Sequence, residues 1–96
     1  MTYKIEMHLH SKESSPCAKT DIKTALKAFK ENGYDAVIIT DHFYHHIFEN
    51  YDNWKDIVDK FLLGYREALK EADKIGIKVF LGMEIRFPQN YNDYLV

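Results

Sequence analysis

Three short apolar runs along the chain predict β-strands. The middle run is β-branched and apolar on both faces, which is typical of a buried parallel strand. The other two are bounded by polar residues and a glycine. The three predicted strands cover Tyr3–Met7, Asp35–Ile39 and Ile77–Gly82.

Side-chain alternation sets the faces of the first strand and of the residues that follow it. Successive side chains of a strand point to opposite faces of the sheet. His8 and His10 are therefore predicted to share one face, with Met7 and Leu9 directed to the core.

The segments between these runs predict two helices. Thr20 or Asp21 provides an N-cap for the first, which ends at Asn32-Gly33, and its apolar positions recur at helical spacing. These positions are Ile22, Ala25, Leu26 and Phe29. The second helix is predicted to begin near Asn53 and to end at Gly76. Its broad apolar face carries Trp54, Ile57, Val58, Phe61, Leu62, Tyr65, Ala68, Leu69 and Ala72.

Strand, helix, strand, helix, strand in this order predicts an α/β fold with right-handed crossovers and a parallel sheet. We find no repeat or linker, so residues 1–96 are assigned to a single domain. Residues 92–96 have the pattern of a fourth strand that stops in mid-run. We therefore expect a fragment or one piece of a larger polypeptide, whose exposed strand edge favours self-association.

Composition narrows the classes of function. Hydrophobic residues make up 46% of the chain and charged residues 29%, which is ordinary for a globular domain. The net charge is −2 and no basic tract occurs, so charge gives no indication of nucleic-acid binding. Cys17 is the single cysteine, which excludes an internal disulfide and favours a reducing cytoplasm. No apolar run approaches membrane-spanning length.

Each predicted strand is followed by a candidate metal ligand. His8 and His10 follow the first, Asp41 and His42 the second, and Glu84 the third. Loops at the carboxyl ends of parallel strands converge on one crevice, so these five side chains are expected to meet. Imidazole and carboxylate together suit a divalent cation such as Zn²⁺, Mn²⁺ or Fe²⁺.

The three motifs His8-Leu9-His10, Thr40-Asp41-His42 and Gly82-Met83-Glu84 resemble, in order and spacing, the first metal motifs of the PHP family, the polymerase and histidinol phosphatase superfamily. The resemblance implies the N-terminal part of a distorted seven-stranded β/α barrel that holds two or three Zn, Mn or Fe ions.

The same resemblance implies roles for the five residues. His8 and His10 would bind the first metal, Glu84 would bridge the first and second, and His42 would bind the third. Asp41 would either touch a metal or orient an imidazole. Glu84 and Asp41 are the predicted catalytic residues.

Two departures from the family pattern stand out. A further His or acidic ligand usually follows the His-x-His pair, whereas this stretch offers Glu13, Ser15 and Cys17. Cys17 would be a thiolate ligand or an inert side chain. The family's later histidines and its terminal Asp-x-His have no counterpart in this chain.

The function implied is metal-assisted hydrolysis of a phosphoester by a metal-activated water. Substrates in the family include histidinol phosphate, nucleotide or oligonucleotide ends, and phosphotyrosine, and the sequence does not choose among them. Two alternatives stay open. One is a non-catalytic, truncated or degenerate metal-binding domain with an assembly role, and the other is an amidohydrolase-type barrel that cleaves C–N bonds.

Other polar and aromatic residues receive weaker assignments. His45 and His46 are expected at a lid or the surface rather than on a metal. Arg86 and Lys12 would contact a phosphate or remain solvated. An aromatic cluster would pack the second helix onto the sheet or line a substrate entrance; its members are Tyr44, Phe48, Tyr51 and Trp54.

Overall fold

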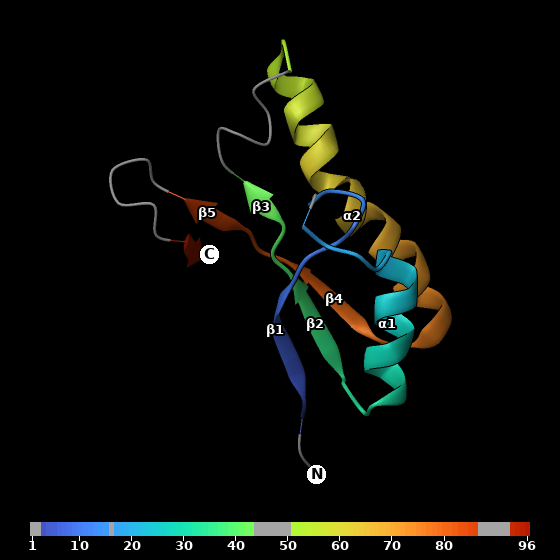
Figure 1. Ribbon diagram of the computed structural model, residues 1–96. Coiled ribbons are helices and arrows are strands. Elements are labelled where there is room, and N and C mark those ends of the chain that lie inside the picture. Colours follow the sequence, from blue (N-terminus) through green and yellow to red (C-terminus); the bar gives the residue numbers. More distant parts are fainter. Residues whose placement is uncertain (1–2, 16, 44–50, 87–92) are drawn as a thin grey trace.

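A computed structural model describes residues 3–15, 17–43, 51–86 and 93–96 of the chain. The elements are β1 (Ile5–Leu9), α1 (Ile22–Glu31), β2 (Ala36–Ile39), β3 (His42–Phe43), α2 (Trp54–Ile75), β4 (Lys78–Leu81), β5 (Glu84–Arg86) and β6 (Asp93–Leu95). The predicted order of strand, helix, strand, helix, strand is present in β1, α1, β2, α2 and β4, and three short strands are added to it (Figure 1).

The main sheet has the parallel order β1-β2-β4. Both helices pack on the same face of this sheet, where residues of β2, α1 and α2 form one hydrophobic cluster (Figure 1). Its buried members are Ile22, Leu26, Val37, Ile39, Ala68, Ala72 and Ile77. The parallel α/β arrangement predicted from the sequence is therefore confirmed.

Both helices begin and end where the sequence predicts. Asp21 caps α1 by accepting a hydrogen bond from the Thr24 backbone N–H, and this bonding by Thr24 holds the pKa of the Asp21 carboxyl below its ordinary value. Asn53 caps α2 in the same way through Asp56 N–H. Gly76 ends α2 in the left-handed conformation, at φ 76°, which glycine adopts without a steric penalty.

A second, smaller sheet extends beyond the main one, with the order β3-β5-β6. β3 and β5 are parallel and place His42 directly opposite Glu84. The predicted run of residues 77–82 thus corresponds to β4, and β5 begins two residues after it. Of the chain that the structure describes, no helix is long and apolar enough to cross a bilayer.

The pattern of residues 92–96 predicted a fourth strand, and β6 confirms it; this strand pairs antiparallel with β5. Two other sequence predictions about the fold are wrong in detail. Met7 is 65% exposed and not in the core, because the pairing of β1 with β2 shifts register between Glu6 and Leu9. Trp54, predicted on the apolar face of the second helix, lies at the start of α2 and is 66% exposed, with its ring centroid 6.0 Å from that of Phe43 in β3.

Candidate metal centre

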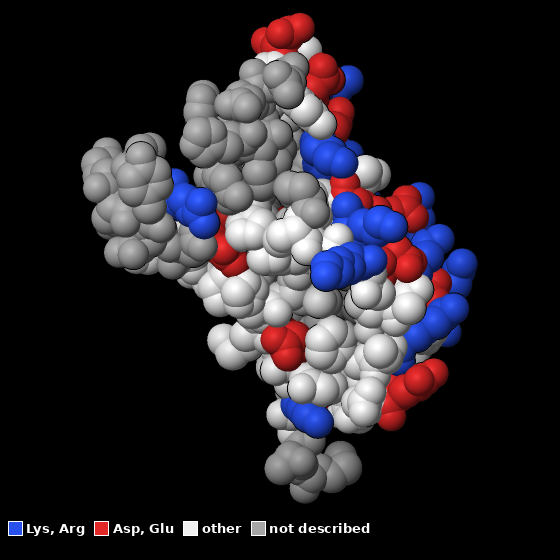
Figure 2. All heavy atoms as spheres, in the orientation of Figure 1, with Lys and Arg blue, Asp and Glu red and all other residues white. Residues whose placement is uncertain are grey.

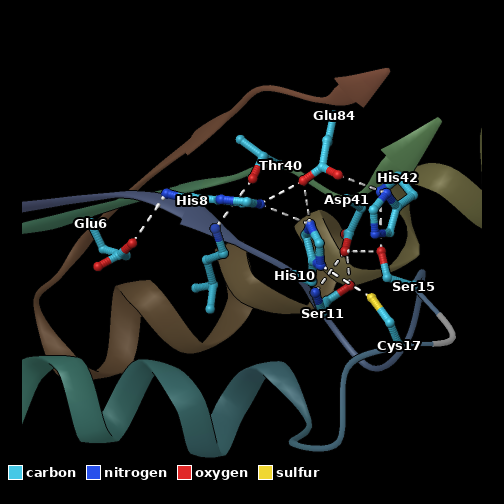
Figure 3. Close-up of polar contacts among 11 residues, drawn as sticks. Glu6, His8, His10, Ser11, Ser15, Cys17, Thr40, Asp41, His42 and Glu84 are labelled. Carbon is cyan, nitrogen blue, oxygen red and sulfur yellow. Dashed lines mark hydrogen bonds and ion pairs between the residues drawn. The ribbon is translucent and has the colours of Figure 1, made fainter. Parts of the chain in front are cut away.

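Three of the predicted ligands meet at the carboxyl ends of β1 and β4 (Figure 3). Nε2 of His8 and Nε2 of His10 lie 2.5 Å and 3.0 Å from the same oxygen, Oε1 of Glu84. The two Nε2 atoms lie 3.2 Å from each other. Glu84 is only 4% exposed, so its carboxylate has little access to water.

These contacts fit a cation better than they fit hydrogen bonds. A carboxylate oxygen accepts, so each Nε2 would have to carry its proton to bond Glu84. Two such N–H groups would then face each other across 3.2 Å. With a divalent cation, both imidazole nitrogens and the carboxylate oxygen contribute lone pairs, and none of these donors is opposed. The donor set of His8, His10 and Glu84 therefore fits a metal ion.

His42 lies on the other side of the same carboxylate. Its Nδ1 is 3.2 Å from Oε2 of Glu84, and its ring centroid is 4.2 Å from that of His10. The residue is 8% exposed. Glu84 thus presents one oxygen to His8 and His10 and the other to His42, an arrangement suited to a carboxylate that bridges two cations.

Asp41 lies beside this cluster but has different contacts. The residue is 1% exposed, and Oδ1 accepts from Ser11 N–H at 2.6 Å and from the Ser15 hydroxyl at 2.7 Å. Oδ2 accepts from the Ser11 hydroxyl at 2.7 Å. Both oxygens therefore bond the loop that follows His10, and Asp41 is in neither group of metal-ligating side chains found among the described residues. Its assignment as a metal ligand stays a prediction, and these contacts give it a positioning role.

The same loop is attached to helix α2. The Ser14 hydroxyl donates to the carbonyl of Lys60 at 2.8 Å and accepts from Gly64 N–H at 2.9 Å, and the Lys60 ammonium donates to the Glu13 carbonyl at 2.6 Å. A Cβ atom on Gly64 would lie 1.8 Å from Oγ of Ser11, so only glycine allows the loop to approach this closely.

Sequence reasoning missed the serines of this loop. Ser11, Ser14 and Ser15 are almost fully buried, although the segment has the composition of a solvated loop. One available signal was Gly64, because a glycine inside a strongly amphipathic helix costs about 1 kcal/mol and often marks a close approach of another segment.

Cys17 and Glu13, the other candidate ligands of the loop after His10, lie in different places. Cys17 lies near His10 and His42, and these three side chains form a second group that could hold a metal ion. Both carboxylate oxygens of Glu13 accept from Ile22 N–H at the start of α1, which places Glu13 away from the cluster. Predictions for Tyr44, His45, His46 and Phe48 concern positions outside the described residues.

The chain thus combines an α/β fold with a cluster of histidines and a glutamate, at the ends of its strands, that could hold a metal ion. The family model of the PHP domain matches residues 6–95, and the chain belongs to this family. The resemblance seen in the three motifs is therefore confirmed.

The fold is similar to a solved structure from Bifidobacterium adolescentis, a protein provisionally named a metal-dependent phosphoesterase. The two share 21% sequence identity with a TM-score of 0.62, and the match covers 99% of this chain and 27% of the other. The chain thus spans about a quarter of the length of that protein. No curated protein matches the chain.

Proposed function

We propose that this chain supplies the N-terminal part of a metal-dependent phosphoesterase centre. The observation that carries the proposal is the convergence of His8 and His10 on one oxygen of the buried Glu84. Membership of the PHP domain family and the similarity to a protein named for phosphoester chemistry support it.

The side chains have distinct tasks in this proposal. His8 and His10 would hold a first divalent cation, Glu84 would contribute its carboxylate to this cation, and His42 would contribute to a further one. Bound cations of this kind supply a water of lowered pKa and neutralise charge on the phosphoryl and leaving oxygens. Asp41 contributes indirectly, because it fixes the loop after His10 and with it the direction of the imidazole.

The substrate class is a phosphorylated small molecule or a nucleotide end. Charged side chains gather mainly over the helices in the view of Figure 2, while the surface around β1 is largely uncharged. A net charge of −2 gives no broad attraction for a long polyanion, so the phosphate would be held by the cations themselves. A reducing, cytoplasmic location is also part of the proposal, because the single cysteine of the chain is exposed and free.

Elemental metal analysis of the purified chain tests the proposal, run beside a His8→Ala/His10→Ala variant. We expect at least one equivalent of Zn, Mn or Fe in the chain and its loss in the variant. Hydrolysis of a phosphomonoester, by this chain and by a longer form that continues it, is then compared with the same double variant. Equal metal content in chain and variant would contradict the proposal.

A second candidate function is a non-catalytic metal-binding domain that serves assembly. Ile5 and Phe80 pair with Ala36 and Ile38, on the face of the sheet opposite the helices. Ile5 is 42% exposed and Phe80 is 50% exposed, so this face offers apolar surface to a partner. Analytical ultracentrifugation distinguishes the two functions, because the assembly role requires a self-associated chain that binds metal without hydrolysing phosphoesters.

A further inference from the structure

A cleft of about 600 Å³ lies between strand β1 and helix α1. β1 is at the edge of the main sheet, and Figure 1 shows α1 alongside it. Both elements line the cleft, together with the loop before α1 and Tyr34 after it. Small-molecule sites in proteins commonly have volumes of roughly 300–1,000 Å³, so this cleft is large enough to hold a ligand.

The cleft has an apolar wall because the apolar face of α1 is wider than the part that the sheet covers. Ile22 and Leu26 are fully buried in the hydrophobic cluster. Ala25 and Phe29 are only partly buried, and both line the cleft. The ring of Phe29 meets that of Tyr34 edge to face, with the ring centroids 4.9 Å apart. These side chains form a preformed surface for an apolar group.

The lining becomes polar toward the start of α1. Lys19 and Thr20 come from the loop before the helix, and Thr24 lies in its first turn. An ammonium group and two hydroxyl groups all donate hydrogen bonds. Aromatic rings at one end of the cleft and donors at the other are suited to a molecule with an apolar body and an acceptor group.

The charge of the lining indicates the sign of that acceptor group. Of the described residues that line the cleft, none is Asp or Glu, whereas Lys4 and Lys19 are both present. Nζ of Lys4 lies 4.3 Å from the centre of the Tyr34 ring and 3.5 Å from the Asn32 carbonyl oxygen, so this ammonium is held at the aromatic end. Two cations beside an apolar wall favour an anion.

We propose that this cleft binds an organic anion with an apolar body, of the class of aromatic carboxylates. The ring packs on Ala25 and Phe29, and the carboxylate pairs with Lys19, because Nζ of Lys4 already bonds Asn32. Lys4 adds attraction over a longer distance. The proposal goes beyond the proposed function, because binding in the cleft requires no metal ion.

Isothermal titration calorimetry of the purified chain with 2-naphthoate tests the proposal. We expect one equivalent to bind, with an affinity that falls as NaCl is added, because salt screens exposed ammonium groups. The uncharged analogue 2-naphthylmethanol should bind about 5-fold more weakly. No binding of naphthoate, or equal binding of the alcohol, would overturn the proposal.

Two substitutions place the probe in the cleft. Ala28→Leu fills the space from α1 and should weaken naphthoate binding by at least about 10-fold, whereas Ala28→Ser leaves the space open and retains binding. Lys19→Met removes the charge and should weaken binding by about 5-fold. Its control is Lys70→Met, at an exposed position of α2 outside the cleft. Circular dichroism confirms that each variant folds.

Two outcomes would place the probe elsewhere and overturn the proposal. Naphthoate that binds the Ala28→Leu variant as tightly as the unaltered chain would occupy another apolar surface, such as the one around the half-exposed Phe80. Naphthoate that no longer binds when EDTA is present would sit on a metal ion. Binding that persists in EDTA and is lost in Ala28→Leu supports the cleft, whatever the metal content of the chain.

Discussion

Asp41 and Glu84 are two buried carboxylates at neighbouring strand ends, yet their surroundings differ in kind. The exposed fractions are 1% and 4%, and the Glu84 N–H donates to the Asp41 carbonyl. Asp41 is surrounded by hydroxyl and backbone donors that satisfy both of its oxygens. Glu84 is surrounded by three imidazoles, and these nitrogens together with its oxygens could hold a metal ion.

The comparison shows that neighbours decide what a buried carboxylate does. Donors that carry protons turn Asp41 into an anchor for the Ser11–Ser15 loop, because each bond replaces one that water would make. Imidazoles offer lone pairs instead, which is why we propose Glu84 as a metal ligand. Four substitutions test this division.

Replacing Glu84 by glutamine is expected to have the largest effect. The amide keeps the shape of the side chain but removes the charge that two cation positions share, so Zn²⁺ affinity falls by more than about 100-fold. Isothermal titration calorimetry measures this change. The control is Glu6→Gln, because Glu6 accepts from the His8 backbone N–H at 3.2 Å and lies outside both ligand groups. A Glu84→Gln affinity within a few-fold of the unaltered chain would show that Glu84 is not a ligand.

Asp41→Asn tests the anchoring role. An amide nitrogen would face the serine hydroxyls or the Ser11 N–H, so at least one buried donor loses its acceptor, at about 1–3 kcal/mol in the free energy of unfolding. Because the loop orients His10, Zn²⁺ affinity falls as well, by about 10-fold.

The control for Asp41→Asn is Asp35→Asn, at a carboxylate that accepts from the Lys4 backbone N–H in an exposed position. Urea unfolding and calorimetry are measured on both variants. If Asp41→Asn lowers stability without changing Zn²⁺ affinity, the loop anchors the fold and does not position the ligands.

Gly64→Ala tests the packing of the same loop on α2. The new methyl group would lie 1.8 Å from Oγ and 2.4 Å from Cβ of Ser11, so the loop must move. We expect this overpacking to lower the free energy of unfolding by about 1–3 kcal/mol, partly offset by the higher helix propensity of alanine. Gly33→Ala is the control, because nothing lies within 4 Å of its Cβ, although its φ of +85° costs about 1 kcal/mol. Urea unfolding distinguishes the two: a cost at Gly64 no larger than at Gly33 would contradict the close approach.

The fold could be predicted from the sequence wherever a periodic pattern sets it. The buried run of β2 and the capped helices followed directly from apolar spacing and end signals. The antiparallel pairing of β6 could not be predicted, because a strand pattern contains no information about its partner. The exposure of Met7 depends on a register shift that alternation does not reveal.

The candidate site shows the same limit. Residue type and the topology of parallel strands predicted that His8, His10, His42 and Glu84 would meet, and the structure brings them together. The buried serines could not be distinguished from solvated ones, because a hydroxyl is buried only when tertiary structure brings it a partner. The sequence left two roles open for Asp41, a metal contact or the orientation of an imidazole, because its serine partners are visible only in the fold.

Asp21→Asn is expected to change stability least. Asp21 caps α1 with an exposed carboxylate, which makes it a reference for the buried carboxylates of Asp41 and Glu84. Its pKa is lowered because Thr24 hydrogen-bonds the charged form, so its contribution to stability is present above the ordinary pKa of a carboxyl and is lost as pH falls through the lowered pKa. Asp21→Asn keeps an oxygen that can accept from Thr24 N–H but does not titrate. The difference in urea midpoint between the unaltered chain and this variant should therefore be greatest near neutral pH and shrink to zero in acid. A difference independent of pH would mean that geometry alone makes the cap, and that charge at an exposed helix end does not stabilise this fold.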